Sequence, residues 1–154
     1  SIYNQEDLKI IEDNNLAIDI LQLPMNINCN IDASSFVKKG CHVYARSIFL
    51  QGIFFSNYNL DLNEQVKKRL DNQKNYLNKK AKLNNMDLGQ YLFSESISLC
   101  KKKKYTGIVL NSSNIKRIGS YIHNHKSLII NKHKDELGYK MMDRYLADPR
   151  LWKI

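Results

Sequence analysis

Two short apolar segments, residues 18–23 and 41–47, most constrain what this chain can fold into, because so little sequence separates them. The first segment ends at Pro24, and the second is rich in Val, Tyr and Cys, so each is typical of a buried strand. The connection between them has room for a short helix and nothing longer. Such a strand–helix–strand unit predicts parallel strands, because a short helix carries the chain back across the sheet.

Helix signals flank both predicted strands. Asn4, with Asp7 three residues later, has the pattern of a capping box and predicts a helix ahead of the first strand. Asp32 is the predicted N-cap of a two-turn helix over residues 33–39, and Gly40 stands where a C-cap glycine belongs. The first third of the chain therefore predicts the order helix, strand, helix, strand.

The rest of the chain continues in the same style. We expect an amphipathic helix from residue 63, with lysines on its outer side, and then an extensively buried helix capped by Asp87. A third strand should follow at residues 106–110. After it we expect a helix capped within residues 112–114 and a last helix at residues 132–146. Three parallel strands alone would leave unpaired edges. The pattern therefore predicts part of a closed α/β structure.

Composition narrows the class of protein. A chain of 154 residues with 43% apolar residues predicts one globular unit, residues 1–154. The net charge of +9 is compatible with nucleic-acid binding, but the lysine run 101–104 is better explained as the end of a helix, so we expect no nucleic-acid partner. No apolar run has the length of a membrane-spanning helix. Three cysteines at irregular spacing predict free thiols in a reducing cytoplasm.

Two motifs add a resemblance. Residues 19–26 read Asp-Ile-Leu-Gln-Leu-Pro-Met-Asn, and residues 44–52 read Tyr-Ala-Arg-Ser-Ile-Phe-Leu-Gln-Gly. Together they resemble two consecutive strand ends in the cofactor-binding half of aldo/keto reductases, and most of all bacterial members linked to surface-polysaccharide biosynthesis. The resemblance implies the C-terminal half of a (β/α)8 TIM barrel, strands 6–8 with flanking helices. The missing initiator methionine fits a piece of a longer product.

The resemblance implies a site for the nicotinamide end of the cofactor. Ser1 matches the serine that ends strand five, and Gln22 matches the glutamine on strand six that contacts the carboxamide. Arg46 stands where a tyrosine stacks on the nicotinamide ring, a position that a planar guanidinium also suits. Two simpler interpretations stay open: Gln22 as a structural glutamine, and Arg46 as a buried partner of a carboxylate.

The rest of the cofactor is implied by two further groups of residues. Ser47, Phe49 and Gln51 fall where the family lines the pyrophosphate and ribose. Ser112 and Arg117 match a serine and an arginine that hold the 2′-phosphate, which favours NADP, with NAD as the alternative. Read without the resemblance, the segment around Ser112 is equally an ordinary helix cap.

The implied function is the C-terminal part of an NAD(P)H-dependent reductase that acts on a small carbonyl or sugar substrate. The family's catalytic Tyr, Asp, Lys and His belong to the first four strands, so we expect no catalytic residue here and no metal site. The chain would place the cofactor and need the missing N-terminal half-barrel. The alternative is a non-catalytic half-barrel that serves as a binding or scaffold protein, pairing with itself as a homo-oligomer or with another chain.

Overall fold

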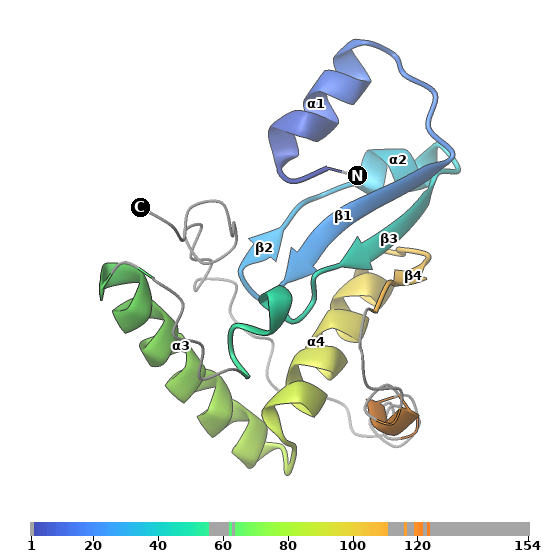
Figure 1. Cartoon of the computed structure of the whole chain (residues 1–154). Coiled ribbons are helices and arrows are strands. Elements are labelled where there is room, and N and C mark those ends of the chain that lie inside the picture. Colours follow the sequence, from blue (N-terminus) through green and yellow to red (C-terminus); the bar gives the residue numbers. More distant parts are fainter. Residues whose placement is uncertain are drawn as a thin grey trace.

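The computed structural model describes residues 2–55, 62, 64–110, 116, 119–121 and 123. The fold is mixed α/β, with a small open sheet of strand order β2–β1–β3–β4 at its centre (Figure 1). β3 lies parallel to both β1 and β4, which confirms the predicted parallel sheet, whereas β2 pairs antiparallel with the end of β1. The strands are β1 (Ile20–Asn26), β2 (Cys29–Asn30), β3 (His42–Arg46) and β4 (Gly107–Ile108).

Capping boxes start two of the helices: the one at Asn4 was predicted, and at Asp87 the prediction was an N-cap only. At the start of α1 (Gln5–Asp13), the Asn4 side chain accepts the backbone N–H of Asp7, and the Asp7 carboxylate accepts the N–H of Asn4. Asp87 begins α4 (Leu88–Lys102) with the same reciprocal arrangement. Each box satisfies backbone donors that the first turn of a helix would otherwise leave without partners.

The other helices follow from local signals as well. The N-cap of α2 (Ser34–Lys38) is Ala33 and not Asp32 as predicted, although the Asp32 carboxylate accepts both the N–H and the hydroxyl of Ser34. The helix ends at Gly40, whose φ of +88° lies in the left-handed region that glycine adopts without strain. The 3₁₀ turn η1 (Leu50–Gly52) follows β3, and α3 (Glu64–Leu83) is the long amphipathic helix.

Helices cover one face of the sheet. Leu8 of α1, Phe36 of α2 and Leu99 of α4 pack in one cluster against alternate residues of β1 and β3. These strand residues are at most 2% exposed: Leu21, Leu23, Met25, Val43 and Ala45. All three helices therefore lie on the same side of the sheet.

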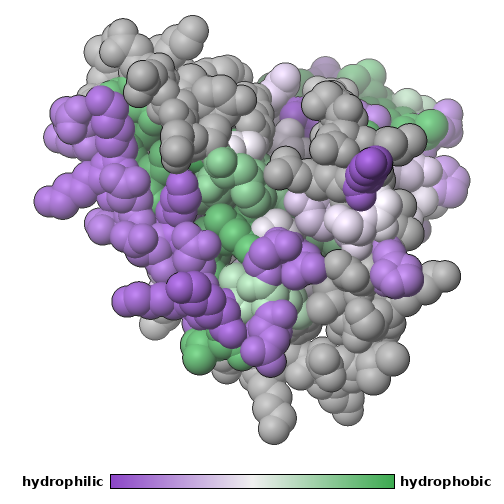
Figure 2. Space-filling model, turned by 60° about the horizontal axis from the view of Figure 1, so that its bottom comes forward, coloured by the Kyte–Doolittle hydropathy of each residue, from purple (hydrophilic) through white to green (hydrophobic). Residues whose placement is uncertain are grey.

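α3 and α4 enclose a second apolar cluster. The two helices meet at the turn that joins them and diverge toward the sheet (Figure 1). Leu77 of α3 and Leu92 of α4 are each 1% exposed, and the segment after β3 adds Phe54 between them, also 1% exposed. Hydrophilic side chains gather along the outer side of α3, next to hydrophobic surface (Figure 2). This confirms the predicted amphipathic helix and the buried α4.

One prediction about β1 is wrong, because the strand does not end at Pro24 but continues to Asn26. The Asp19 carbonyl points toward β3, where it accepts the N–H of His42, and the Gln22 carbonyl points the other way, to the N–H of Ile2. Alternate residues point the same way along a strand, so the missing N–H of Pro24 faces away from β3. The proline therefore costs the parallel ladder no hydrogen bond.

Smaller differences concern element boundaries. The helix predicted over residues 33–39 occupies Ser34–Lys38, the strand predicted at residues 106–110 is limited to Gly107–Ile108, and β2 was not predicted at all. Of the helix predicted after residue 112, the described residues 116, 119–121 and 123 are helical. The helix predicted at residues 132–146 lies outside the described residues.

Candidate functional site

The second face of the sheet carries two of the predicted site residues. In the parallel register, Gln22 of β1 lies opposite Tyr44 of β3, and Pro24 lies opposite Arg46. Since Leu21 and Leu23 face the helices, Gln22 and Arg46 project from the other face of two neighbouring strands. Gln22 is exposed and Arg46 is half-buried. The sheet thus brings together the amide and the guanidinium that the sequence proposed for one ligand.

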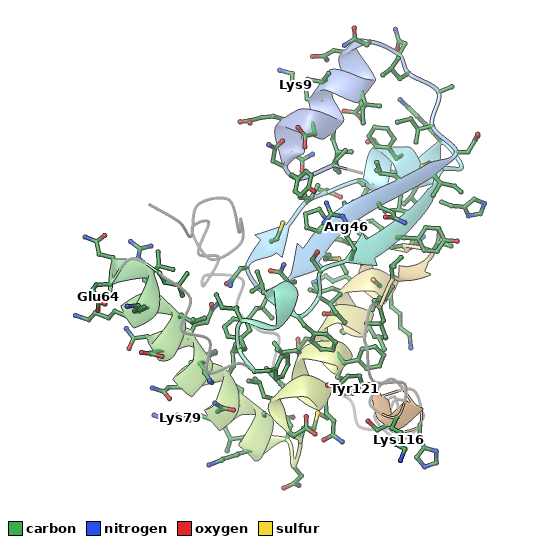
Figure 3. All side chains as sticks on the ribbon, in the orientation of Figure 1. Lys9, Arg46, Glu64, Lys79, Lys116 and Tyr121 are labelled. Carbon is green, nitrogen blue, oxygen red and sulfur yellow. The ribbon has the colours of Figure 1, made fainter. Side chains whose placement is uncertain are left out.

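Arg46 is held from two sides at the carboxyl end of β3. One guanidinium nitrogen, Nη2, donates to the Ile2 carbonyl at 2.9 Å, and Nη1 donates to Ser47 Oγ at 3.2 Å. The guanidinium also lies 4.6 Å from the ring centre of Tyr3, a cation–π distance. Figure 3 shows Arg46 against the middle of the sheet. The Ile2 N–H is in turn bonded to the Gln22 carbonyl at 3.1 Å, which fixes the first residues of the chain beside β1.

A tight turn follows Arg46. Ser47 has a φ of +57° and Leu50 a φ of +49°, both in the left-handed region that non-glycine residues rarely adopt. The Ser47 carbonyl accepts the N–H of Leu50 at 3.0 Å and the side-chain N–H of Asn26 at 3.3 Å. Backbone held in such a conformation needs support from its surroundings. Here the support comes from β1.

Three amide side chains form a buried cluster behind this turn. Asn26 and Asn28 are each 2% exposed, and Gln73 of α3 is 4% exposed. The Asn26 side-chain oxygen accepts the N–H of Asn28 at 2.9 Å, and the amides of Asn28 and Gln73 donate to each other. Sequence reasoning missed this cluster. Its one signal is the spacing of Gln73, which falls within the apolar stripe of α3 beside Leu70 and Leu77.

Phe49 occupies an aromatic cluster. Its ring centre lies 5.6 Å from that of Phe55 and 5.4 Å from that of Tyr121, and Tyr121 lies 5.5 Å from Phe93 of α4. These separations are typical of packed aromatic pairs. The described ring contacts of Phe49 are therefore packing contacts within the loop after β3 and with Tyr121, which in turn packs on α4.

The other predicted site residues are not described. Ser1, Ser112 and Arg117 lie outside the described residues, and so does the side chain of Gln51, whose backbone belongs to η1. The end of the site that was predicted to hold the adenosine phosphate is therefore not part of the described geometry. What the structure describes is the end predicted for nicotinamide.

Burial raises the pKa of three groups in α4 and the segment that follows it. The pKa of Glu95 rises from 4.5 to about 7 because burial disfavours the carboxylate, and Lys80 of α3 opposes the shift. Burial also raises the pKa of the Cys100 thiol to about 12 and that of the Tyr105 phenol to about 12. These shifts make the thiol and the phenol poor nucleophiles at neutral pH.

Within the described part of the chain, no group of three His, Cys, Asp or Glu side chains is arranged to hold a metal ion.

The chemistry of the second face suits the nicotinamide end of a cofactor. Gln22 offers one acceptor and two donors, the complement of a carboxamide. Arg46 offers a planar cation whose orientation is fixed by Ile2 and Ser47. Arg46 is the last residue of β3 and lies at the carboxyl end, the side at which parallel α/β folds bind ligands, whereas Gln22 is the third of the seven residues of β1 and lies short of that end.

Comparison with known proteins adds no assignment. A scan against protein-family models and a search of curated proteins both found no match to this chain. The resemblance to aldo/keto reductases therefore stays a prediction that rests on the two motifs.

Among the described residues, no helix is long and apolar enough to cross a membrane.

Proposed function

We propose that this chain is the cofactor-holding part of an NAD(P)H-dependent reductase of the aldo/keto reductase type. The observation that carries the proposal is the placement of Gln22 and Arg46 on the face of a parallel sheet that the described helices leave uncovered, with Arg46 at the start of the Ser47 turn. In this proposal Gln22 binds the carboxamide of nicotinamide and Arg46 stacks against its ring. Hydride then passes from the bound cofactor to a small carbonyl or sugar substrate.

The arrangement of the sheet supports a half-barrel. Parallel strands are normally covered on both faces, and here the described helices cover only one. β1, β3 and β4 also lie side by side in chain order, as consecutive strands of a (β/α)8 barrel do. We therefore propose that the uncovered face is the interior of a barrel, completed by a partner half or a second copy. The Tyr, Asp, Lys and His of such a reductase would come from that partner.

The proposed cofactor is NADP, with NAD as the alternative, because Ser112 and Arg117 are the residues proposed to hold a 2′-phosphate. Arg46 adds a preference between redox states. A guanidinium stacked on oxidised nicotinamide places two positive charges together, whereas the reduced ring is neutral. The proposed site therefore binds NADPH more tightly than NADP⁺.

A fluorescence titration of the full chain with NADPH tests the proposal. We expect saturable binding that weakens about tenfold or more in Arg46→Gln, since a charge-assisted or stacking contact is worth over 1 kcal/mol. Lys79→Gln is the matched control, because it removes one positive charge from the outer side of α3, far from Arg46 (Figure 3). No binding by the unaltered chain, or equal weakening in both variants, contradicts the proposal.

The uncovered face also favours a second candidate, a scaffold that pairs through this surface. Ile20 is 63% exposed and Val109 is 41% exposed. Burying such side chains against a partner contributes a hydrophobic driving force. Light scattering on the full chain should then show a dimer that dissociates in Ile20→Asp. A compact monomer for the unaltered chain contradicts self-pairing.

A further inference from the structure

We infer that Asn26 is a positioning residue for Arg46 and acts through the Ser47 turn. The inference deepens the proposed function: what Arg46 binds rests on that proposal, but how Arg46 is held does not. Asn26 lies at the end of β1 and Arg46 at the end of β3, in adjacent parallel strands. Both side chains bond to Ser47, which links them: the Asn26 amide donates to the Ser47 carbonyl and the Arg46 guanidinium donates to Ser47 Oγ.

The first step is from Asn26 to the backbone of Ser47. The Asn26 amide donates to the Ser47 carbonyl, which also accepts the N–H of Leu50. A serine at φ +57° lacks the intrinsic preference of glycine for this region, so the turn depends on contacts that fix its carbonyl. Asn26 supplies one such contact from a neighbouring strand.

The second step is from Ser47 to the guanidinium. Ser47 Oγ accepts Nη1 of Arg46 at 3.2 Å, and the direction of that oxygen is set by the backbone conformation of Ser47. The opposite side of the guanidinium is held by the Ile2 carbonyl at 2.9 Å. The left-handed turn therefore places one of the acceptors that orient Arg46. If the turn relaxes, the guanidinium loses this acceptor and its alignment over Tyr3.

The third step is what holds Asn26 itself. Its oxygen accepts the N–H of Asn28, and the amide of Asn28 pairs reciprocally with Gln73 of α3. All three amides are at most 4% exposed, so each must keep its partners or pay a desolvation penalty. With its oxygen committed to Asn28, the Asn26 N–H₂ group is left directed at Ser47. The buried cluster thereby transmits the position of α3 to the turn.

Nuclear magnetic resonance of the full chain, labelled with ¹⁵N-arginine, tests the inference. The Nε–H resonance of Arg46 is assigned by its loss in Arg46→Lys. In Asn26→Ser, the shorter hydroxyl still serves the N–H of Asn28 but does not reach Ser47. We expect the Arg46 resonance to move as the Tyr3 ring current changes, and NADPH binding to weaken about fivefold, the effect of one neutral hydrogen bond.

Leu99→Ala is the control for stability alone, because Leu99 is buried in α4 and belongs neither to the amide cluster nor to the apolar cluster that contains Leu50 of the turn. It should lower stability and leave the Arg46 resonance in place. If Asn26→Ser does not fold, Asn26→Asp takes its place, since it keeps the acceptor and removes the donor. An unmoved Arg46 resonance in the folded variant overturns the inference, even if NADPH binds. A moved resonance supports it, even if the unaltered chain binds no NADPH, and in that case the proposed function alone fails.

Discussion

The two faces of the sheet are built from the same strands and differ in almost every respect. On the helix-covered face, Leu23 and Val43 are completely buried under α1, α2 and α4. On the uncovered face, the neighbouring residues Gln22 and Tyr44 are exposed and half-buried. One face holds the fold together, and the other is mixed, with the exposed Ile20 and Gln22 on the same strand as the buried Pro24. The comparison predicts that substitutions one residue apart have very different consequences.

The largest difference should separate Leu23→Ala from Ile20→Ala. Leu23 is 0% exposed, so its truncation removes apolar contacts and leaves a cavity, at a cost of about 2–5 kcal/mol in the free energy of unfolding. Ile20 is 63% exposed on the other face, and its truncation should change stability by about 0.5 kcal/mol or less. Urea denaturation measures both. Similar losses in the two variants would show that the second face is covered in solution, as the scaffold hypothesis requires.

Glu95 of α4, one of the helices that cover the first face, should make the stability of the chain depend on pH. Its pKa is about 7 in the folded chain and ordinarily 4.5, so the folded state binds the proton more tightly. The stabilisation is fully present below pH 4.5 and is lost as the pH rises through about 7, a loss on the order of 3 kcal/mol. Glu95→Gln should abolish this fall. Glu64→Gln, whose carboxylate is exposed on α3, should keep it, and parallel curves for Glu95→Gln and the unaltered chain would contradict the assignment.

A matched pair of tyrosines gives the next largest contrast. The buried Tyr105 hydroxyl donates to the Ile31 carbonyl and accepts the N–H of Ala33, each at 3.0 Å. Tyr105→Phe leaves both groups without this partner and should cost about 1–3 kcal/mol. Tyr44→Phe on the uncovered face should be nearly neutral. Thermal unfolding compares the two variants, and a neutral Tyr105→Phe would mean that water replaces the lost hydroxyl.

Much of this architecture could be predicted from local sequence. The capping box at Asn4, the N-cap at Asp87 and the glycine at Gly40 act within one turn of helix, and the structure confirms all three. The continuation of β1 through Pro24 could not be predicted in this way. A proline is tolerated only when its missing donor faces away from a neighbouring strand, and which side that is depends on the register with β3.

The residues of the candidate site could be predicted from the sequence, but most of the contacts that hold them in place could not. Once the parallel register is known, period-two alternation puts Gln22 and Arg46 on one face. The left-handed Ser47 and the partnership of Asn28 with Gln73 depend on contacts between residues distant in sequence. A glutamine within an apolar stripe signals a buried polar partner. It does not say which residue that partner is.

Gln22→Ala should have the smallest effect on stability. This substitution also tests the difference between the two faces of the sheet most directly. Gln22 is exposed, so its truncation should change the free energy of unfolding by about 0.5 kcal/mol or less. In the proposed site the same change removes the carboxamide partner and weakens NADPH binding about fivefold or more. Urea denaturation and NADPH titration on one preparation separate the two quantities. Loss of binding without loss of stability is what a functional face predicts, whereas unchanged binding would remove Gln22 from the site and leave Arg46 to carry the proposal alone.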